Sequence, residues 1–143
     1  MAVKPIPDGY HTITPALVVE GADAVCEFMK NAFGAEELMM HRHANGTIWH
    51  AELQIGDSRI MLSEADEEMK PMPAALSLYL ENVDAVYRRA IEAGAVSIRE
   101  PADQFYGDRS GGVRDMAGNQ WWISTHVEDV SAEELERRAN AAR

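Results

Sequence analysis

The sequence predicts an α+β fold. Two consecutive βαβββ modules form a curved mixed sheet around a cleft, with helices on the outside and a further helix at the C-terminus. The order strand, helix, three strands occurs twice between residues 10 and 127. A Gly-Ala pair follows each predicted helix, in NAFGAEEL (31–38) and in IEAGAVSI (91–98). One helix cannot cover both faces of a sheet, so two modules side by side leave a concave, helix-free face as a cleft.

Composition restricts the class of protein. The chain has 143 residues, of which 46% are hydrophobic and 26% charged, as in an ordinary soluble globule. A formal net charge of −11 opposes nucleic-acid binding; it indicates a surface that keeps the chain in solution or, alternatively, one that attracts cationic small molecules. The single cysteine, Cys26, excludes an internal disulfide and is typical of a reducing compartment. The sequence shows no signal-peptide pattern and no apolar run of membrane-spanning length, so we expect a cytoplasmic protein without membrane contact.

The first module covers about residues 10–65. Apolar residues at helical spacing predict a helix over residues 22–34, and Gly34 is a helix stop. β-branched and alternating segments predict the strands, and the Asn-Gly pair at Asn45-Gly46 predicts a hairpin between two of them. The expected strands are residues 11–19, 36–43, 48–55 and 58–65.

The second module covers about residues 74–127, after an acidic, proline-containing linker at 66–73. A helix is expected over residues 83–94, capped by Asn82 or Asp84. A C-terminal helix over residues 131–143 begins with a capping box of Ser131 and Glu134. The strands expected in this module are residues 75–80, 95–101, 107–115 and 119–127. The whole chain, residues 1–143, is interpreted as one domain.

Three segments resemble the glyoxalase/bleomycin-resistance/dioxygenase superfamily, also called vicinal oxygen chelate proteins. They are FMKNAFGAEE, HAELQIGDSRIMLSE and DQFYGDRSGGVRDMAGNQWWISTH, and the likeness is greatest to the PhnB-like, glyoxalase-like branch. The resemblance spans about residues 10–130. It implies the duplicated fold, a homodimer, and a small-molecule ligand held in the cleft. One fold hosts many chemistries, so the resemblance does not fix the reaction.

Metal-binding members of this superfamily take one ligand from the first and last strand of each half, and these ligands are His or Glu in the glyoxalase I type. The corresponding positions here are Thr14, Met61 (or Ser63), Ala75 (or Ser77) and Trp122. None of these side chains is a good ligand for a divalent ion. The sequence therefore predicts no metal site and no cofactor.

Strand alternation assigns side chains to the cleft. If Trp121 and Ile123 pack under a helix, then Trp122 projects into the cleft where relatives carry a metal-binding carboxylate. His50 and Glu52 share a face and are weak catalytic candidates as a proton relay, against a purely structural hydrogen bond. Arg109 either pairs with Asp108 or binds an anionic group. The residues assigned to ligand binding are Thr14, Trp49, His50, Glu52, Gln54, Met61, Ser63, Ser77, Tyr79, Phe105, Tyr106, Arg109, Trp122 and Ser124.

Two functions from different classes follow. The first is a metal-free binding protein that sequesters an aromatic or cationic natural product, as antibiotic-resistance members of the superfamily do. The second is a glyoxalase-like lyase, isomerase or dioxygenase that uses a divalent ion held by His11, His50, Glu52 or Glu64, in a swapped dimer if needed. A metal-free enzyme with His50 or Glu52 as base is a third alternative. The binding protein is the favoured interpretation.

Overall fold

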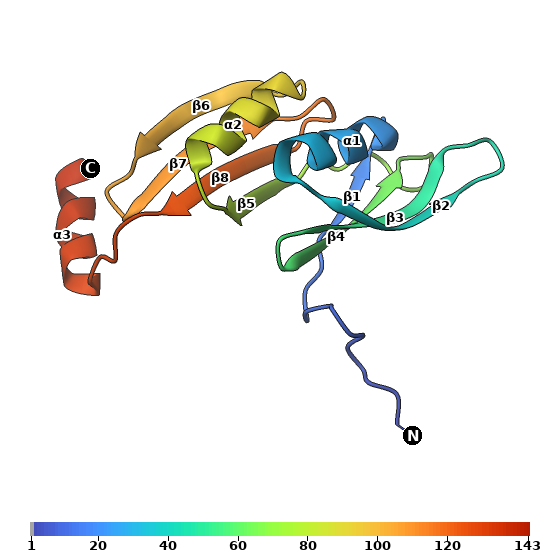
Figure 1. Ribbon diagram of the computed structural model, residues 1–143, viewed down its shortest axis with the longest axis horizontal. Coiled ribbons are helices and arrows are strands. Elements are labelled where there is room, and N and C mark those ends of the chain that lie inside the picture. Colours follow the sequence, from blue (N-terminus) through green and yellow to red (C-terminus); the bar gives the residue numbers. More distant parts are fainter. Residues whose placement is uncertain (1) are drawn as a thin grey trace. The chain divides into compact units, whose positions relative to one another are not determined.

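The computed structural model describes residues 2–143. The chain divides into two compact units, one ending at Ala74 and the other beginning at Ala75. Each unit contains a four-stranded mixed sheet with one helix packed on it, and the second unit adds a C-terminal helix (Figure 1). The described part of the chain contains no helix that is both long and apolar enough to span a membrane.

Unit 1 follows the order βαβββ. Its sheet has the strand order β1-β4-β3-β2, with β1 parallel to β4 and the other neighbours antiparallel. Its elements are β1 (Ala16–Val19), α1 (Ala22–Phe33), β2 (Glu36–Arg42), β3 (Ile48–Ile55) and β4 (Ser58–Glu64).

The core of unit 1 lies between α1 and one face of the sheet. Val25, Phe28 and Met29 of α1 are at most 1% exposed, and so are Leu53 and Leu62 of the strands. Their spacing is that of one helical face against alternate strand residues, as the sequence predicts. Burial of each such side chain contributes about 1.5–3 kcal/mol to the free energy of unfolding.

Unit 2 repeats the order and adds a helix. Its sheet has the strand order β5-β8-β7-β6, with β5 parallel to β8. Its elements are β5 (Ala75–Tyr79), α2 (Val83–Glu92), β6 (Val96–Asp103), β7 (Asp108–Arg114), β8 (Gln120–His126) and α3 (Ala132–Ala142).

The core of unit 2 forms between α2 and the sheet. Val83 and Val86 of α2 are buried, as are Val113 of β7 and Trp121 and Ile123 of β8. The Asn82 side chain caps α2 by accepting a hydrogen bond from the backbone N–H of Ala85 over 3.3 Å. This cap resolves the choice between Asn82 and Asp84 in favour of Asn82.

The α+β class and the duplicated βαβββ order are confirmed, and the differences are at element ends. The first strand begins at Ala16 and not at residue 11, because Pro15 has no N–H to donate to a ladder. Helix α2 ends at Glu92, two residues before Gly94. In the segment 66–73, Met72 forms an isolated antiparallel bridge with Val18.

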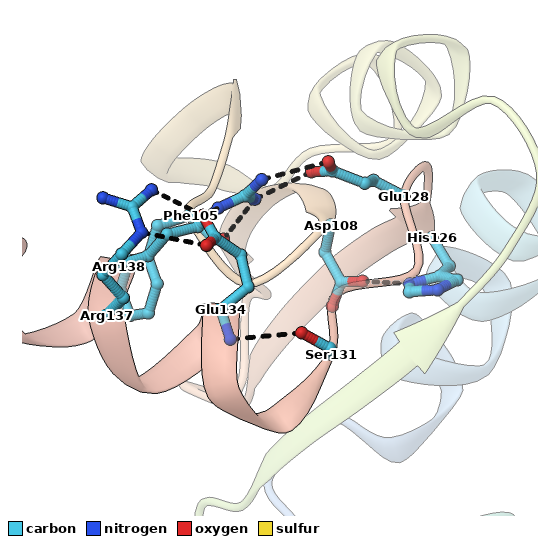
Figure 2. Close-up of polar contacts among 8 residues, drawn as sticks. All are labelled: Phe105, Asp108, His126, Glu128, Ser131, Glu134, Arg137 and Arg138. Atoms are coloured by element: carbon cyan, nitrogen blue, oxygen red, sulfur yellow. Dashed lines mark hydrogen bonds and ion pairs between the residues drawn. The ribbon is translucent and has the colours of Figure 1, made fainter.

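Helix α3 is held by polar contacts, since none of its residues is buried. The Ser131 hydroxyl accepts a hydrogen bond from the Glu134 N–H, which is half of the expected capping box. The Glu134 carboxylate instead accepts from Arg137 and Arg138, and these guanidinium groups lower its pKa to about 2. Arg138 also donates to the Phe105 carbonyl and to Glu128, which ties α3 to the turn between β6 and β7 (Figure 2).

Candidate functional site

The face of the unit 1 sheet that α1 does not cover carries a row of candidate residues. Glu52 of β3 lies opposite Met61 of β4, which in turn lies opposite Ala16 of β1. On its other side Glu52 lies opposite Met39 of β2. This helix-free face of unit 1 also bears His50, Gln54, Arg59 and Ser63 by alternation along the strands.

A β-bulge places Trp49 on the same face. His41 lies opposite His50 and Arg42 opposite Ile48, so Trp49 is the extra residue of β3. As a result Ile48 is fully buried, whereas Trp49 is 60% exposed. The Trp49 ring centroid lies 6.1 Å from that of His41 and 6.3 Å from that of His50. Strict alternation along β3 would place the Trp49 side chain on the same face as Ala51. The bulge turns the Trp49 side chain to the opposite face, which bears His50.

His50 and Glu52 form the closest polar pair on this face. His50 Nε2 and Glu52 Oε2 lie 2.8 Å apart, and the Glu52 side chain is only 6% exposed. The other carboxylate oxygen, Oε1, is buried and has no hydrogen-bond partner among the described residues. An unsatisfied buried acceptor costs about 1–3 kcal/mol of folding free energy. A ligand that brings an N–H or O–H donor to Oε1 recovers this cost.

The other residues of the metal alternative are engaged elsewhere in unit 1. The Glu64 carboxylate accepts hydrogen bonds from the backbone N–H groups of Gly21, over 2.9 Å, and Ala22, over 3.0 Å, at the start of α1. The His11 ring lies 3.3 Å from the Asp57 carbonyl. The structure therefore brings His50 and Glu52 together but directs Glu64 toward the helix.

The two adjacent tryptophans of β8 lie on opposite faces of the unit 2 sheet. Trp121 is fully buried among core residues, while Trp122 is half-buried on the face that α2 does not cover. The six-membered ring of the Trp122 indole packs closely against Gly112, where an added Cβ would lie 2.5 Å from Cζ3 of the indole. The Arg99 guanidinium lies over the Trp122 ring, 5.5 Å from its centroid. Ser77 of β5 lies opposite Trp122 in the parallel pair, and Ser124 is two residues further along β8.

A chain of charged hydrogen bonds lies at the end of this helix-free face of unit 2. The Tyr79 hydroxyl donates to Asp108 Oδ2 over 2.7 Å, and His126 Nδ1 lies 2.8 Å from Asp108 Oδ1. His126 Nε2 lies 2.8 Å from Asp129. Hydrogen bonds to Asp108 and then Asp129 raise the pKa of His126, and the bond to Asp108 raises the pKa of Tyr79. Figure 2 shows the pair of Asp108 and His126, which the sequence analysis did not connect.

Arg109 is used inside unit 2. Its guanidinium donates to both carboxylate oxygens of Asp84 on α2, over 2.8 and 3.0 Å, and to Asp103 over 3.3 Å. These bonds raise the pKa of Arg109. Of the two roles left open by the sequence, the contacts are those of an ion pair, with Asp84 and Asp103 in place of Asp108.

The remaining candidates lie at edges and turns. Phe105 and Tyr106, in the turn between β6 and β7, are each 40% exposed and pack edge to face with centroids 5.2 Å apart. The Gln54 side chain accepts from Arg59 Nε over 3.2 Å and donates to the Gly56 carbonyl. Thr14 is half-buried and precedes β1.

The residues at the positions that the sequence resemblance assigns to metal ligands are poor donors for a divalent ion. Thr14, Met61, Ala75 and Trp122 offer a hydroxyl, a thioether, a methyl group and an indole. Imidazole and carboxylate are the side chains that such ions take from proteins. Within residues 2–143, no group of three or more His, Cys, Asp and Glu side chains is placed to hold a metal ion.

Comparison with known proteins agrees with this geometry of two four-stranded units. The model of the Glyoxalase/Bleomycin resistance protein/Dioxygenase superfamily matches residues 10–123. The uncharacterized protein Rv0887c of Mycobacterium tuberculosis is 32% identical over 135 residues, which cover 87% of this chain and 79% of that protein.

Solved structures share the fold at lower sequence identity. TioX from Micromonospora sp. ML1 superposes with a TM-score of 0.66 at 24% identity, covering 80% of this chain and 99% of TioX. The fosfomycin resistance protein FosX from Listeria monocytogenes superposes with a TM-score of 0.63 at 19% identity, covering 87% of this chain and 97% of FosX. The PhnB protein from Bacillus cereus superposes with a TM-score of 0.61 at 17% identity, covering 80% of this chain and 99% of the PhnB protein. With its two βαβββ units and a family match over most of its length, the chain belongs to the glyoxalase/bleomycin resistance protein/dioxygenase superfamily.

Proposed function

We propose that this protein is a metal-free small-molecule-binding protein that sequesters an aromatic or cationic natural product. The observation that carries the proposal is the position of Trp122. Its indole packs against Gly112, on the face of the unit 2 sheet opposite α2, and remains partly exposed. A supported, partly exposed indole offers an aromatic surface to a planar ligand.

The surroundings of Trp122 suit an organic molecule better than a metal ion. Stacking on one aromatic ring contributes about 0.5–1.5 kcal/mol beyond the buried area, so further contacts are needed for tight binding. Ser77 and Ser124 supply hydroxyl groups beside the indole, and Tyr79 is 67% exposed on the same face. A mixture of aromatic surface and a few polar groups is typical of ligand sites.

Resistance by sequestration, a homodimer and a cytoplasmic location belong to the same proposal. FosX is a fosfomycin resistance protein by name, but at 19% identity the likeness to it supports the fold alone. The resistance class therefore rests on the superfamily and on the indole of Trp122.

A titration of tryptophan fluorescence tests the proposal. We expect that aromatic antibiotics and metabolites in a panel quench the emission, and that Trp122→Ala abolishes the response. Trp49→Ala is the matched control, since Trp49 is also exposed but lies in unit 1, and it should retain the response. A response that survives Trp122→Ala, or a panel in which no compound quenches, contradicts the proposal.

A divalent-ion enzyme is the second candidate, and one observation favours it. His50 and Glu52 lie side by side with one carboxylate oxygen free, so two donors of suitable chemistry are already together. Elemental analysis of protein purified without chelator separates the candidates. Stoichiometric zinc, nickel, iron or manganese that is lost in Glu52→Ala supports the enzyme.

A further inference from the structure

We propose that the helix-free face of unit 1 binds an organic cation, a protonated amine whose N–H group donates to the free Oε1 of Glu52. This inference rests on the proposed small-molecule function and names a ligand class for a second position on the chain. The buried, unpartnered Oε1 is the observation that starts it.

The neighbours of Glu52 cannot satisfy this oxygen. An ionised carboxylate offers about four acceptor positions, and His50 occupies one on Oε2. The residues directly opposite Glu52 on both sides are Met39 and Met61, whose thioethers do not donate. The residues directly opposite Glu52 therefore supply no donor to Oε1, which is open to a donor from a ligand.

The charge of the pair favours a cation over a neutral donor. Hydrogen bonds between ionised partners are about twice as strong as neutral ones. Arg59, a basic residue on the same face, donates through Nε to Gln54 and lies over the Tyr10 ring at 4.4 Å. None of the ion pairs in the described chain joins Glu52 to a lysine or arginine, and the net charge of −11 attracts cations.

The side chains around Glu52 can admit such a ligand. Met39 and Met61 are both partly exposed, and a methionine side chain has three rotatable bonds and adapts to irregular shapes. The exposed Trp49 ring, beside His50, offers an aromatic face to the cation or to an attached ring. An amine on a short aromatic scaffold therefore matches the donor, the charge and the neighbouring ring.

Benzylamine and benzyl alcohol are matched probes, because they have the same shape and differ in charge. Calorimetry and NMR titration of the His50 ring signals on the full chain give the affinities. We expect benzylamine to bind at least about tenfold more tightly than benzyl alcohol, and Glu52→Gln to remove about that factor. Glu36→Gln is the control, because Glu36 is exposed and lies opposite Gln54 of the same sheet. It should change the affinity by less than about twofold.

Three results overturn the inference: equal affinities for the two probes, no binding of benzylamine, or unchanged binding by Glu52→Gln. The affinities of benzylamine and benzyl alcohol are compared on the unaltered chain. This comparison therefore tests the inference even if the Glu52→Gln variant folds poorly. The Trp122 response is read in the Trp49→Ala chain, where quenching cannot come from the ring beside His50 in unit 1. A Trp122 response without benzylamine binding rejects only this inference, whereas loss of both rejects the proposed function as well.

Discussion

The indole Nε1 of Trp121 donates a hydrogen bond to Oδ2 of Asp115 over 2.8 Å, and both side chains are buried. Asp115 also accepts from the backbone N–H groups of Ala117 and Asn119 and from the Asn119 side chain. One carboxylate thus closes the turn between β7 and β8 and fixes the tryptophan that precedes Trp122. Trp122, the next residue of β8, lies on the opposite face of the sheet by alternation.

Replacement of Asp115 by alanine should therefore destabilise unit 2. The change removes a buried carboxylate that accepts four hydrogen bonds, and we expect the free energy of unfolding to fall by about 2–4 kcal/mol. Denaturant unfolding followed by circular dichroism measures the loss. Glu100→Ala, at an exposed position of β6, is the control and should have little effect. Equal stability of the two variants would show that the turn does not depend on Asp115.

Gly112→Ala should displace the Trp122 indole. The new Cβ lies within 3.0 Å of three atoms of the indole ring, so the ring must move or the strand must shift. We expect the free energy of unfolding to fall by about 1–3 kcal/mol. We also expect aromatic ligands to quench the tryptophan fluorescence less than in the unaltered chain.

The double variant Gly112→Ala/Trp122→Ala isolates this contact. With the indole removed, the added methyl group meets no ring, and the cost of Gly112→Ala should fall below about 0.5 kcal/mol. Unfolding of the four proteins of the cycle gives the coupling. Additive effects would mean that the cost arises elsewhere in β7.

Stability should depend on pH through His126. Its pKa is raised above the ordinary value of 6.5 by hydrogen bonds to Asp108 and Asp129, so folding favours the protonated ring. The resulting stabilisation is complete below the unfolded pKa and is lost as the pH rises through the folded pKa.

His126→Gln checks this linkage. The wild-type chain should have a higher free energy of unfolding than the variant at about pH 5. This difference should be smaller at about pH 9. NMR titration of the ring gives the folded pKa directly. A difference that is constant with pH, or a folded pKa at or below 6.5, contradicts the prediction.

Glu64→Ala should weaken the start of α1. Gly21, the N-cap residue, has no side chain to cap the helix, and the Glu64 carboxylate from β4 accepts the N–H groups of Gly21 and Ala22 instead. Loss of such a cap costs about 0.5–2 kcal/mol, which thermal and denaturant unfolding resolve. Glu67→Ala, in the exposed acidic segment that follows, should be neutral by comparison. Equal unfolding free energies of Glu64→Ala and Glu67→Ala would contradict the capping role.

The periodic signals of the sequence predicted the parts of the fold that depend on local patterns. The helix predicted for residues 22–34 is α1 with Gly34 at φ 67, where the left-handed backbone ends the helix. The alternation at Trp121 and Trp122 correctly separated a buried indole from a partly exposed one. Both results follow because the periods of 3.6 and 2 are set by the backbone and are visible in the order of residues.

Periodic patterns in the sequence did not predict the bulge in β3 or the partners of Arg109 and Asp108. The bulge at Trp49 reverses the alternation of β3, and nothing in the residue types of that strand marks the extra residue. The partners of Arg109 lie on α2 and β6, so the neighbouring Asp108, which the sequence offered, was the wrong partner. Asp108 instead joins Tyr79 and His126 through strands that are distant in sequence.

By itself, the sequence determined the duplicated order of elements and the core faces of the helices. Only the tertiary structure decided which polar groups meet: the capping of α1 by Glu64, the pairing of Arg109 with Asp84, and the burial of Glu52 with one oxygen free. The physical reason is range. Propensity and periodicity act between residues a few positions apart, whereas a hydrogen bond requires two groups within about 3 Å, and strand register sets that distance for residues far apart in the chain.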